Sequence, residues 1–469
     1  MNKIYEVIFK DDKETLSFKD LSYNSKNLKY IPSHIENILI DADSPNTSEI
    51  PFINDLPNTL TNITFGNYIN FPLTNLPNSI KYLKFGFHFN SIFSPPKYLT
   101  HLELNENYNI QLPTLPLTLI SLILGNSFNQ NIDNLPPNIN FLQLGIQFNK
   151  PIDNLPINLK ELILGKNFNQ KIDFLPEGLT HLTLGKSFCQ TIDFIPKNLK
   201  YLIIGSNHLG SKFNLPIDSL KQHTNLISIM LKGEFNQPIN NLPNCLKSIV
   251  LGTDFNNSID DIPDSVESLE LGYNFNKIIN KLPQNLSYLK LSFWFNQYID
   301  NLPDSITELD LGYSFDKPIT KLPSQIKKVI FSNKFSQPIE NVKWFNIKEI
   351  IFGNNFNHNI NKLPDTVAKL YLGTSFSLPI TKFPTNLRSI EFSSLYNIQL
   401  PNLPENLEYL KLGSKFNYPL ELPPKLIRLT INNPNYSHFL NLPKSLKILV
   451  IGHKIKYSES KSTIIEIID

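Results

Sequence analysis

Short segments in which apolar and polar residues alternate return along this chain about every 20 residues. The segment around Leu162 and Leu164 has this alternation, which is the period of a half-buried β-strand. Only one such segment occurs in each period of the repeat. The strands of successive coils must therefore stack as a parallel sheet, about 4.8 Å apart.

One coil reads L-x-x-L-x-L-G-x-x-F-N-x-x-I-x-x-L-P-x-x, and its Phe-Asn pair is the clearest landmark. With weaker early copies at Tyr68, Phe89 and Tyr108 and a diverged copy near residue 31, we count about twenty coils. The other landmark aromatic residues are Phe128, Phe148, Phe168, Phe188, Phe235, Phe255, Phe275, Phe295, Phe315, Phe335, Phe356, Phe376, Tyr396, Phe416 and Tyr436.

The part of each coil that returns to the next strand is not expected to be helical. Parallel pairing needs a crossover, and here it carries Phe168, Ile172 and Leu175 followed by Pro176, at a site where proline argues against a helix. The fold we predict is mainly β, an elongated solenoid of about twenty 20-residue coils with a parallel sheet on the concave face. A three-sided parallel β-helix, in which the convex side also pairs as a sheet, is the alternative.

Two polar or small positions of the coil have a predicted structural use. Glycine follows the strand in most coils, as at Gly145 and Gly165, which suggests a positive φ or a tight backbone approach. The asparagine after each landmark phenylalanine has a short amide that can bond turn backbone, so stacked copies could form a ladder. Whether this ladder points inward or along the surface stays open.

Composition excludes several classes of partner and compartment. Among 469 residues, 43 are basic and 41 acidic, which gives a net charge of +2 and nothing that attracts nucleic acid or an anionic membrane. No apolar run is long enough to cross a bilayer, and Glu6 and Lys10 interrupt any signal-peptide core. Cys189 and Cys245 offer no disulfide framework. We expect an intracellular, monomeric protein.

The recurring residues also carry a resemblance. The pattern in FNQPINNLPNCLKSIVLG, residues 235–252, resembles the FNIP repeat, and L-x-x-L-x-L once per coil resembles short leucine-rich repeats. The resemblance covers about residues 60–452. It implies a leucine-rich-repeat-like protein-interaction solenoid in the cytoplasm of an amoeba, or in the host cytoplasm if the source is a giant virus of amoebae. The lack of long asparagine tracts favours a virus.

The predicted organisation has three parts: an N-terminal β cap over residues 1–30, the FNIP-like solenoid over 31–452 with an irregular insertion at 206–234, and a C-terminal cap or tail over 453–469. Some proteins with FNIP repeats begin with an F-box that links them to ubiquitin ligases. The segment that precedes the first repeat here is too short for that module.

No pattern typical of catalysis, a cofactor or a metal site occurs. The nine histidines have no helical i, i+4 pair, no CxxC is present, and no glycine-rich phosphate loop has a usual spacing. A bacterial leucine-rich-repeat ligase would need a catalytic cysteine after the repeats, but the short segment after Gly452 contains none. The resemblance carries over no catalytic residues either. We therefore predict no enzyme activity and no cofactor.

Function is expected where the coils differ. The leading hypothesis is a non-enzymatic scaffold that binds another protein. The alternatives are an adaptor that delivers targets to a host ubiquitin ligase without its own F-box, and an enzyme with an unrecognised site. The candidate partner-binding residues are Ile163, Tyr201, Ile203, Met230, Val250, Trp294, Trp344 and Tyr371.

Most of these residues lie at outward positions of the predicted strands, where Ile, Val and Tyr could also serve simply as good strand formers. Trp344 lies in a break of the repeat at 342–347, where Lys343 replaces the usual proline, and Trp294 follows a strand. Tryptophan is enriched among binding hot spots. The alternative for Trp344 is that it fills the space that the proline vacated. In the larger break, between Phe188 and Phe235, Asp218 or Ser219 could cap a short helical turn through Lys221–His223.

Overall fold

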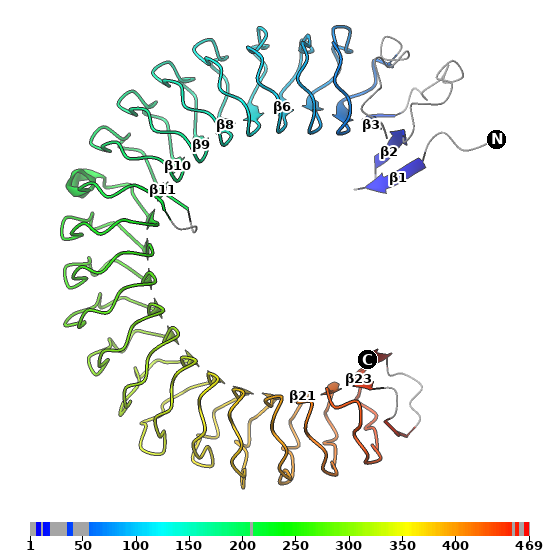
Figure 1. Ribbon diagram of the computed structural model, residues 1–469, viewed down its shortest axis with the longest axis vertical. Coiled ribbons are helices and arrows are strands. Elements are labelled where there is room, and N and C mark those ends of the chain that lie inside the picture. The colour runs from blue at the N-terminus through cyan, green and yellow to red at the C-terminus, as the bar shows by residue number, and fades with distance from the viewer. Residues whose placement is uncertain are drawn as a thin grey trace. The chain divides into compact units, whose positions relative to one another are not determined.

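The computed structural model describes residues 6–10, 13–18, 35–40, 56–206, 210–452, 455–458 and 464–468. The chain divides into two compact units, Met1–Gln237 and Pro238–Asp469. Both units are built from the same kind of coil, in which one short strand alternates with an irregular return segment (Figure 1).

In the first unit, an antiparallel hairpin of two strands leads into a run of parallel strands in chain order, β2 to β12. Its strands are β1 (Glu6–Lys10), β2 (Lys13–Phe18), β3 (Asn37–Ile40), β4 (Asn62–Phe65), β5 (Tyr82–Lys84), β6 (His101–Leu104), β7 (Ser121–Leu124), β8 (Phe141–Leu144), β9 (Glu161–Leu164), β10 (His181–Leu184), β11 (Tyr201–Ile204) and β12 (Ser228–Leu231).

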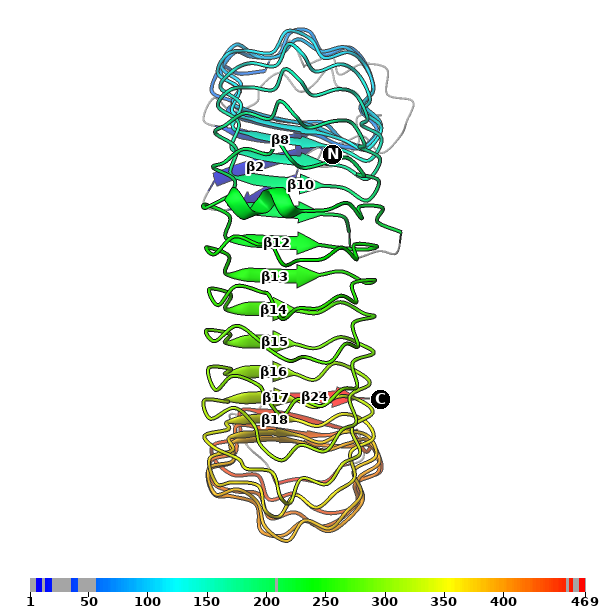
Figure 2. The same ribbon diagram turned by 90° about the vertical axis from the view of Figure 1, so that its left-hand side faces the viewer.

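In the second unit, all strands are parallel and each pairs with the next in the sequence, as the aligned arrows of β13 to β18 in Figure 2 show. Its strands are β13 (Ser248–Leu251), β14 (Ser268–Glu270), β15 (Tyr288–Lys290), β16 (Glu308–Asp310), β17 (Lys328–Ile330), β18 (Glu349–Ile351), β19 (Lys369–Tyr371), β20 (Ser389–Glu391), β21 (Tyr409–Leu412), β22 (Arg428–Ile431), β23 (Ile448–Gly452) and β24 (Ile464–Ile468).

The alternation of the sequence sets the two faces of each sheet. In β9, Leu162 and Leu164 are buried while Glu161 and Ile163 remain half-exposed. The strands pair in register, so Leu162 lies between Leu142 and the equivalent leucine of β10. In the described strands, each coil therefore places its inward apolar side chains on those of its neighbours, and the predicted parallel-sheet solenoid is confirmed.

The return segments carry the rest of the core without forming a second sheet. Among the described residues, only three isolated β-bridges occur outside the named strands. Phe168 is fully buried and stacks on the landmark rings of both neighbouring coils, and Ile172 of the same return segment is 2% exposed. The convex side thus does not pair as the alternative, the three-sided β-helix, requires, and the predicted leucine-rich-repeat-like solenoid is confirmed.

The spacing between coils shows that the strands lie on the concave side of each arc (Figure 1). In the first unit, the His181 and Tyr201 rings on adjacent strands are 4.5 Å apart, whereas the Phe168 and Phe188 rings of the same coils are 6.4 Å apart. The corresponding distances in the second unit are 4.3 Å for Phe293–Tyr313 and 6.3 Å for Phe295–Phe315. Coils that are closer at the strand than at the phenylalanine must curve toward the strand.

The larger break of the repeat contains a complete coil. Phe213 is fully buried and stacks on both Phe188 and Phe235 at 6.0 Å. Its separation along the chain from each of these two residues is longer than the regular period, so Phe213 does not lie at a position that the 20-residue spacing predicts. The insertion predicted at 206–234 is therefore one coil that is longer than usual in two places. Residues 207–209, which belong to the first, lie outside the described residues.

The second lengthening is the predicted helical turn, which is a 3₁₀ turn, η3 (Asp218–Gln222), on the outer side of its arc (Figure 1). The predicted cap is wrong. The residue at the N-cap position is Ile217, whose side chain makes no capping hydrogen bond. Leu220 is fully buried, so packing of this apolar side chain rather than a polar cap holds the turn against the core.

The predicted ends of the solenoid are not tested. Residues 19–34 and 453–454, where the boundaries at 30 and 452 fall, lie outside the described residues. Before the first boundary, the described residues form the hairpin β1–β2. After the second boundary, β24 pairs with β23. The boundaries themselves stay predictions.

Candidate functional site

No site with the chemistry of catalysis stands out from the described residues. No group of three or more histidine, cysteine, aspartate or glutamate side chains among them could hold a metal ion. Among these residues, Cys189 and Cys245 are half-buried and form no disulfide. In the same part of the chain, no helix is long and apolar enough to cross a bilayer. We next compare the exposed surfaces of the two units.

The sheet face of the first unit carries a column of half-exposed apolar side chains. The column occupies the third position of the strands β7 to β12, and the register places each member beside the next. We call this set the apolar column, and its members are Ile123, Gln143, Ile163, Thr183, Ile203 and Met230. Four of the six are apolar, and the other two are uncharged.

Aromatic side chains border the apolar column at the first position of the same strands. The Tyr201 ring stacks on the His181 ring, with centroids 4.5 Å apart and planes 15° from parallel. Tyr201 is 38% exposed, and Phe141, two strands before His181, is half-exposed. An apolar centre with a polar and aromatic border is the composition usual for a protein-binding patch.

The sheet face of the second unit is different, because charged side chains of opposite sign alternate from strand to strand. The pairs are Lys328–Glu308 at 2.7 Å, Lys411–Glu391 at 3.1 Å, Lys369–Glu349 at 3.6 Å and Lys290–Glu270 at 3.8 Å. The hydrogen bond from Lys328 to Glu308 raises the pKa of Lys328. Burial, together with nearby Glu270, raises the pKa of Tyr288 to about 12. On this face, each of these four lysines is thus paired with a glutamate on the preceding strand.

The candidate residues predicted from the sequence do not form one site. Ile163, Ile203 and Met230 lie together in the apolar column, with Tyr201 on its border. Val250 on β13 and Tyr371 on β19 also occupy third positions, but on the sheet of the second unit. The strand of Tyr371 lies between those of Ile351 and Glu391.

The two tryptophans lie off the sheet faces and in different surroundings. Trp344 is half-buried, and its ring meets that of the buried Phe331 at 6.4 Å and 62°. Lys343, which replaces the usual proline, donates its N–H to the Thr320 carbonyl at 3.0 Å, a bond that proline cannot make. Trp294, in contrast, is 44% exposed on the loop after β15.

The asparagines that follow the landmark phenylalanines form the predicted ladder, and it runs along the surface. The N–H of Asn149 donates to Asn129 Oδ1 at 3.0 Å, and the N–H of Asn169 donates to Asn149 Oδ1 at 2.9 Å. Both bonds are exposed. The ladder therefore ties one coil to the next outside the core, where its amides are also accessible to ligands.

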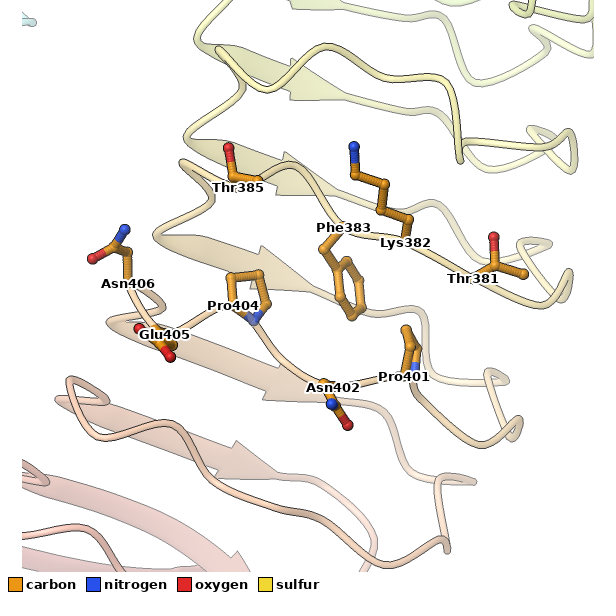
Figure 3. A pocket seen from close by; sticks show the side chains of 9 residues that line it. All are labelled: Thr381, Lys382, Phe383, Thr385, Pro401, Asn402, Pro404, Glu405 and Asn406. Atoms are coloured by element: carbon orange, nitrogen blue, oxygen red, sulfur yellow. The ribbon is translucent and has the colours of Figure 1, made fainter.

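A hollow of about 710 Å³ opens on the return side of the second unit, between the coils of Thr381–Thr385 and Pro401–Asn406 (Figure 3). In the coil before, Thr381 donates its N–H to Asn361 Oδ1 at 2.8 Å. Pro401 occupies the same position one coil later and has no N–H, so this bond is lost. Figure 3 shows the ring of Phe383, which is 6% exposed, directed toward the prolines. We interpret the hollow as a packing consequence of Pro401.

Two carboxylates on the return side link stability to pH. The Ser324 N–H donates to Asp304 at 2.8 Å and the Thr385 N–H donates to Asp365 at 2.9 Å, and these bonds hold both carboxyl pKa values below their usual range. A depressed pKa contributes stability above the unfolded value of about 3.9, and this contribution is lost as pH falls through the folded value.

We therefore expect the urea midpoint to fall on acidification from about pH 5 to about pH 2.5, and to fall less in an Asp304→Asn, Asp365→Asn double variant. The amide oxygen can still accept the same N–H, as Asn361 does for Thr381. Urea titrations monitored by circular dichroism at both pH values measure the difference. Equal losses in the two proteins would contradict the prediction.

Comparisons with known proteins agree with this geometry. The FNIP repeat profile matches residues 51–88, 128–167, 148–187, 168–207, 255–293 and 295–334. The chain is similar to CroV588, a circular leucine-rich-repeat protein from a giant virus, with 29% identity over 91% of this chain and 79% of that one, at a TM-score of 0.69.

It is also similar in fold to YopM from Yersinia enterocolitica, with 19% identity over 88% of this chain and 91% of that one, at a TM-score of 0.57. No curated protein matches the sequence. Leucine-rich-repeat-like solenoids are typical of protein-interaction scaffolds and are generally not enzymes. The six matched segments of this chain are therefore FNIP repeats, built on a leucine-rich-repeat-like solenoid.

Proposed function

We propose that this protein is a non-enzymatic scaffold that binds another protein through the apolar column of its first unit. The observation that carries the proposal is the column of half-exposed, uncharged side chains on one sheet face, in which Ile203 and Met230 are direct neighbours and Thr183 separates Ile203 from Ile163. Solvent-facing apolar residues that lie together, rather than singly, are characteristic of interaction sites.

The shape and composition of this face describe the expected partner. Because the strands lie on the concave side of the arc, a convex protein surface fits it better than a flat one. The apolar column has no charged member, so the matching surface should present apolar side chains at its centre. Met230 adds an unbranched, adaptable side chain that tolerates differences in partner shape.

The test is an Ile203→Lys, Met230→Lys double variant in a quantitative pull-down from amoeba cells. Both side chains point away from the core, so we expect the fold to be kept while partner recovery falls at least about tenfold, equivalent to about 1.4 kcal/mol of binding free energy. A Leu117→Lys, Ile157→Lys variant is the matched control, because these residues are 68% and 74% exposed in the same unit but lie outside the strands.

Retention of the same partners by the sheet-face variant, at wild-type levels, would show that the apolar column is not the binding surface. An equal loss in the control variant would mean that surface charge rather than position matters. Recovery of cullin-ligase subunits with the wild-type protein would favour the ubiquitin-ligase adaptor over a simple scaffold. No contact or charge on the described surface favours the adaptor in advance.

A further inference from the structure

Four aromatic rings meet on the loops that follow β14 to β16 in the second unit. Tyr273, Phe293 and Tyr313 form one stack, with ring centroids 4.4 and 4.3 Å apart and planes 15° and 3° from parallel. The Trp294 indole stands edge-on to this stack, at 89° to the Tyr273 ring and 75° to the Phe293 ring. Packing therefore fixes the indole on one side, although 44% of Trp294 is exposed.

The indole is one wall of a hollow of about 480 Å³, which we call the tryptophan hollow. The rest of its lining is polar and consists of three asparagines, two serines, Asp316 and Lys334. It contains no Leu, Ile, Val or Met. The hollow thus combines a single aromatic surface with amide and hydroxyl groups and one charge of each sign.

Two of the asparagines present donors in a fixed orientation. The N–H of Asn296 donates to Asn276 Oδ1 at 2.9 Å, and the N–H of Asp316 donates to Asn296 Oδ1 at 3.0 Å. Because a backbone N–H can only donate, the oxygen of each amide must face the ladder, which assigns the other end as NH₂. Neither NH₂ group donates to another group within the described residues. Both remain available to a ligand.

Charge and shape limit the class of ligand. A phosphate group or a nucleic acid requires a cluster of cationic side chains, whereas Lys334 is balanced here by Asp316. An apolar peptide side chain requires an apolar pocket, and the lining has no aliphatic residue. A pyranose ring fits both features, because its C–H face packs on an aromatic ring while its hydroxyls exchange hydrogen bonds with amides.

We propose that the tryptophan hollow binds a neutral, hexose-containing glycan. One sugar ring stacks on Trp294, and its hydroxyl oxygens accept hydrogen bonds from the NH₂ groups of Asn276 and Asn296. This site is independent of the apolar column, which lies in the first unit. The ammonium of Lys334 lies 5.4 Å from the Trp294 ring centroid, but such a contact is weak at an exposed site and the incoming sugar displaces it.

Trp294 itself supplies the signal for the first experiment. The chain has two tryptophans, so a Trp344→Phe variant leaves Trp294 as the sole indole. It is titrated with hexamers of glucose, mannose, galactose and N-acetylglucosamine. We expect at least one to shift the indole emission saturably, with a Kd at or below about 1 mM. No saturable shift with any of the four would overturn the proposal.

Variants then test the assigned contacts with the sugar that binds, by isothermal titration calorimetry. Trp294→Ala and Asn296→Ala are each expected to weaken binding at least about tenfold. Asn149→Ala is the control, because Asn149 occupies the same ladder position in the first unit and should leave the affinity unchanged. Unchanged affinity in Trp294→Ala or Asn296→Ala, or a tenfold loss in Asn149→Ala, would refute the assignment.

Lys334→Ala tests the expectation that the ligand is neutral. Removing the ammonium frees the indole face, so the affinity should stay the same or rise. A loss of about tenfold or more would mean that the ligand is held by its negative charge, and the proposal of a neutral glycan would be wrong.

Discussion

Replacing Phe168 by alanine is expected to lower the free energy of unfolding by about 3–5 kcal/mol. The ring is fully buried and stacks on Phe148 and Phe188, with centroids 6.2 and 6.4 Å away. Each coil of a solenoid is stabilised by its two neighbours, so one truncation weakens two interfaces at once. Urea unfolding followed by circular dichroism measures the loss, and amide exchange should accelerate in the coils of residues 148–188.

Phe174→Ala is the matched control, since Phe174 belongs to the same coil but is 69% exposed. Its removal should change stability by no more than about 0.5 kcal/mol. If the two variants were equally stable, the aromatic stack would not be what holds the coils together. The solenoid would then depend on the sheet and its leucines alone.

The fold could be predicted from the sequence because each structural role has a fixed position in the repeat. Leu162 and Leu164 recur at the strand, Phe168 in the return segment, and Pro176 at the end of that segment, where it argues against a helix. A strand that recurs once in every coil can pair only with its own copies in parallel. The sequence left open whether the return segments pair as a second sheet, and the structure decides it, because only three isolated bridges occur outside the named strands among the described residues.

Where the coil changes length, the same reasoning fails. Phe213 was missed because its separations from Phe188 and Phe235 both exceed the period, although Phe213-Asn214 has the landmark sequence. The cap expected at Asp218 or Ser219 was wrong for a related reason. Burial of Leu220 positions the turn, and burial in an irregular coil depends on neighbouring coils that local sequence does not specify.

The candidate sites differ in how far the sequence could reveal them. The apolar column follows directly from the register, since equal strand positions in successive coils must become neighbours. The aromatic stack beside Trp294 was missed, although Tyr273, Phe293 and Tyr313 are separated by one repeat period each and thus occupy one coil position. Their spacing predicts the stack. The exposure of Trp294 depends on what the adjacent coils place around it, which only the structure gives.

Gly165→Ala is expected to destabilise the first unit by about 3 kcal/mol, at the upper end of overpacking costs. A Cβ atom at Gly165 would lie 2.0 Å from the carbonyl oxygen of Gly145 and 2.4 Å from its carbon. These are backbone atoms of the paired coil, so no rotamer change can relieve the overlap. The coils of β8 and β9 must separate, which strains the sheet register. Urea unfolding of the full chain measures the cost.

A second glycine in the same coil provides a control, because its replacement by alanine is not expected to lower the stability. A Cβ atom at Gly178 would meet only the flexible Lys160 Nζ at 3.0 Å, with the next atoms 3.7 Å away. Gly178→Ala should therefore be neutral or stabilise by about 0.4–1 kcal/mol, because it restricts the unfolded chain. Similar costs at the two sites would show that glycine is needed after the strand for its flexibility and not for close approach.

Replacing Gly165 by serine separates the steric cost of a side chain from the stabilisation that a hydroxyl hydrogen bond provides. Ser292 and Ser332 occupy the equivalent position in the second unit, where their hydroxyls donate to the carbonyls of Phe275 and Phe315 in the preceding coils. In Gly165→Ser, the hydroxyl can reach the carbonyl of the preceding landmark phenylalanine in the same way. We expect the free energy of unfolding of Gly165→Ser to be about 1 kcal/mol higher than that of Gly165→Ala. If the serine variant were no more stable than the alanine variant, this hydrogen bond would not explain why serine replaces glycine in those coils.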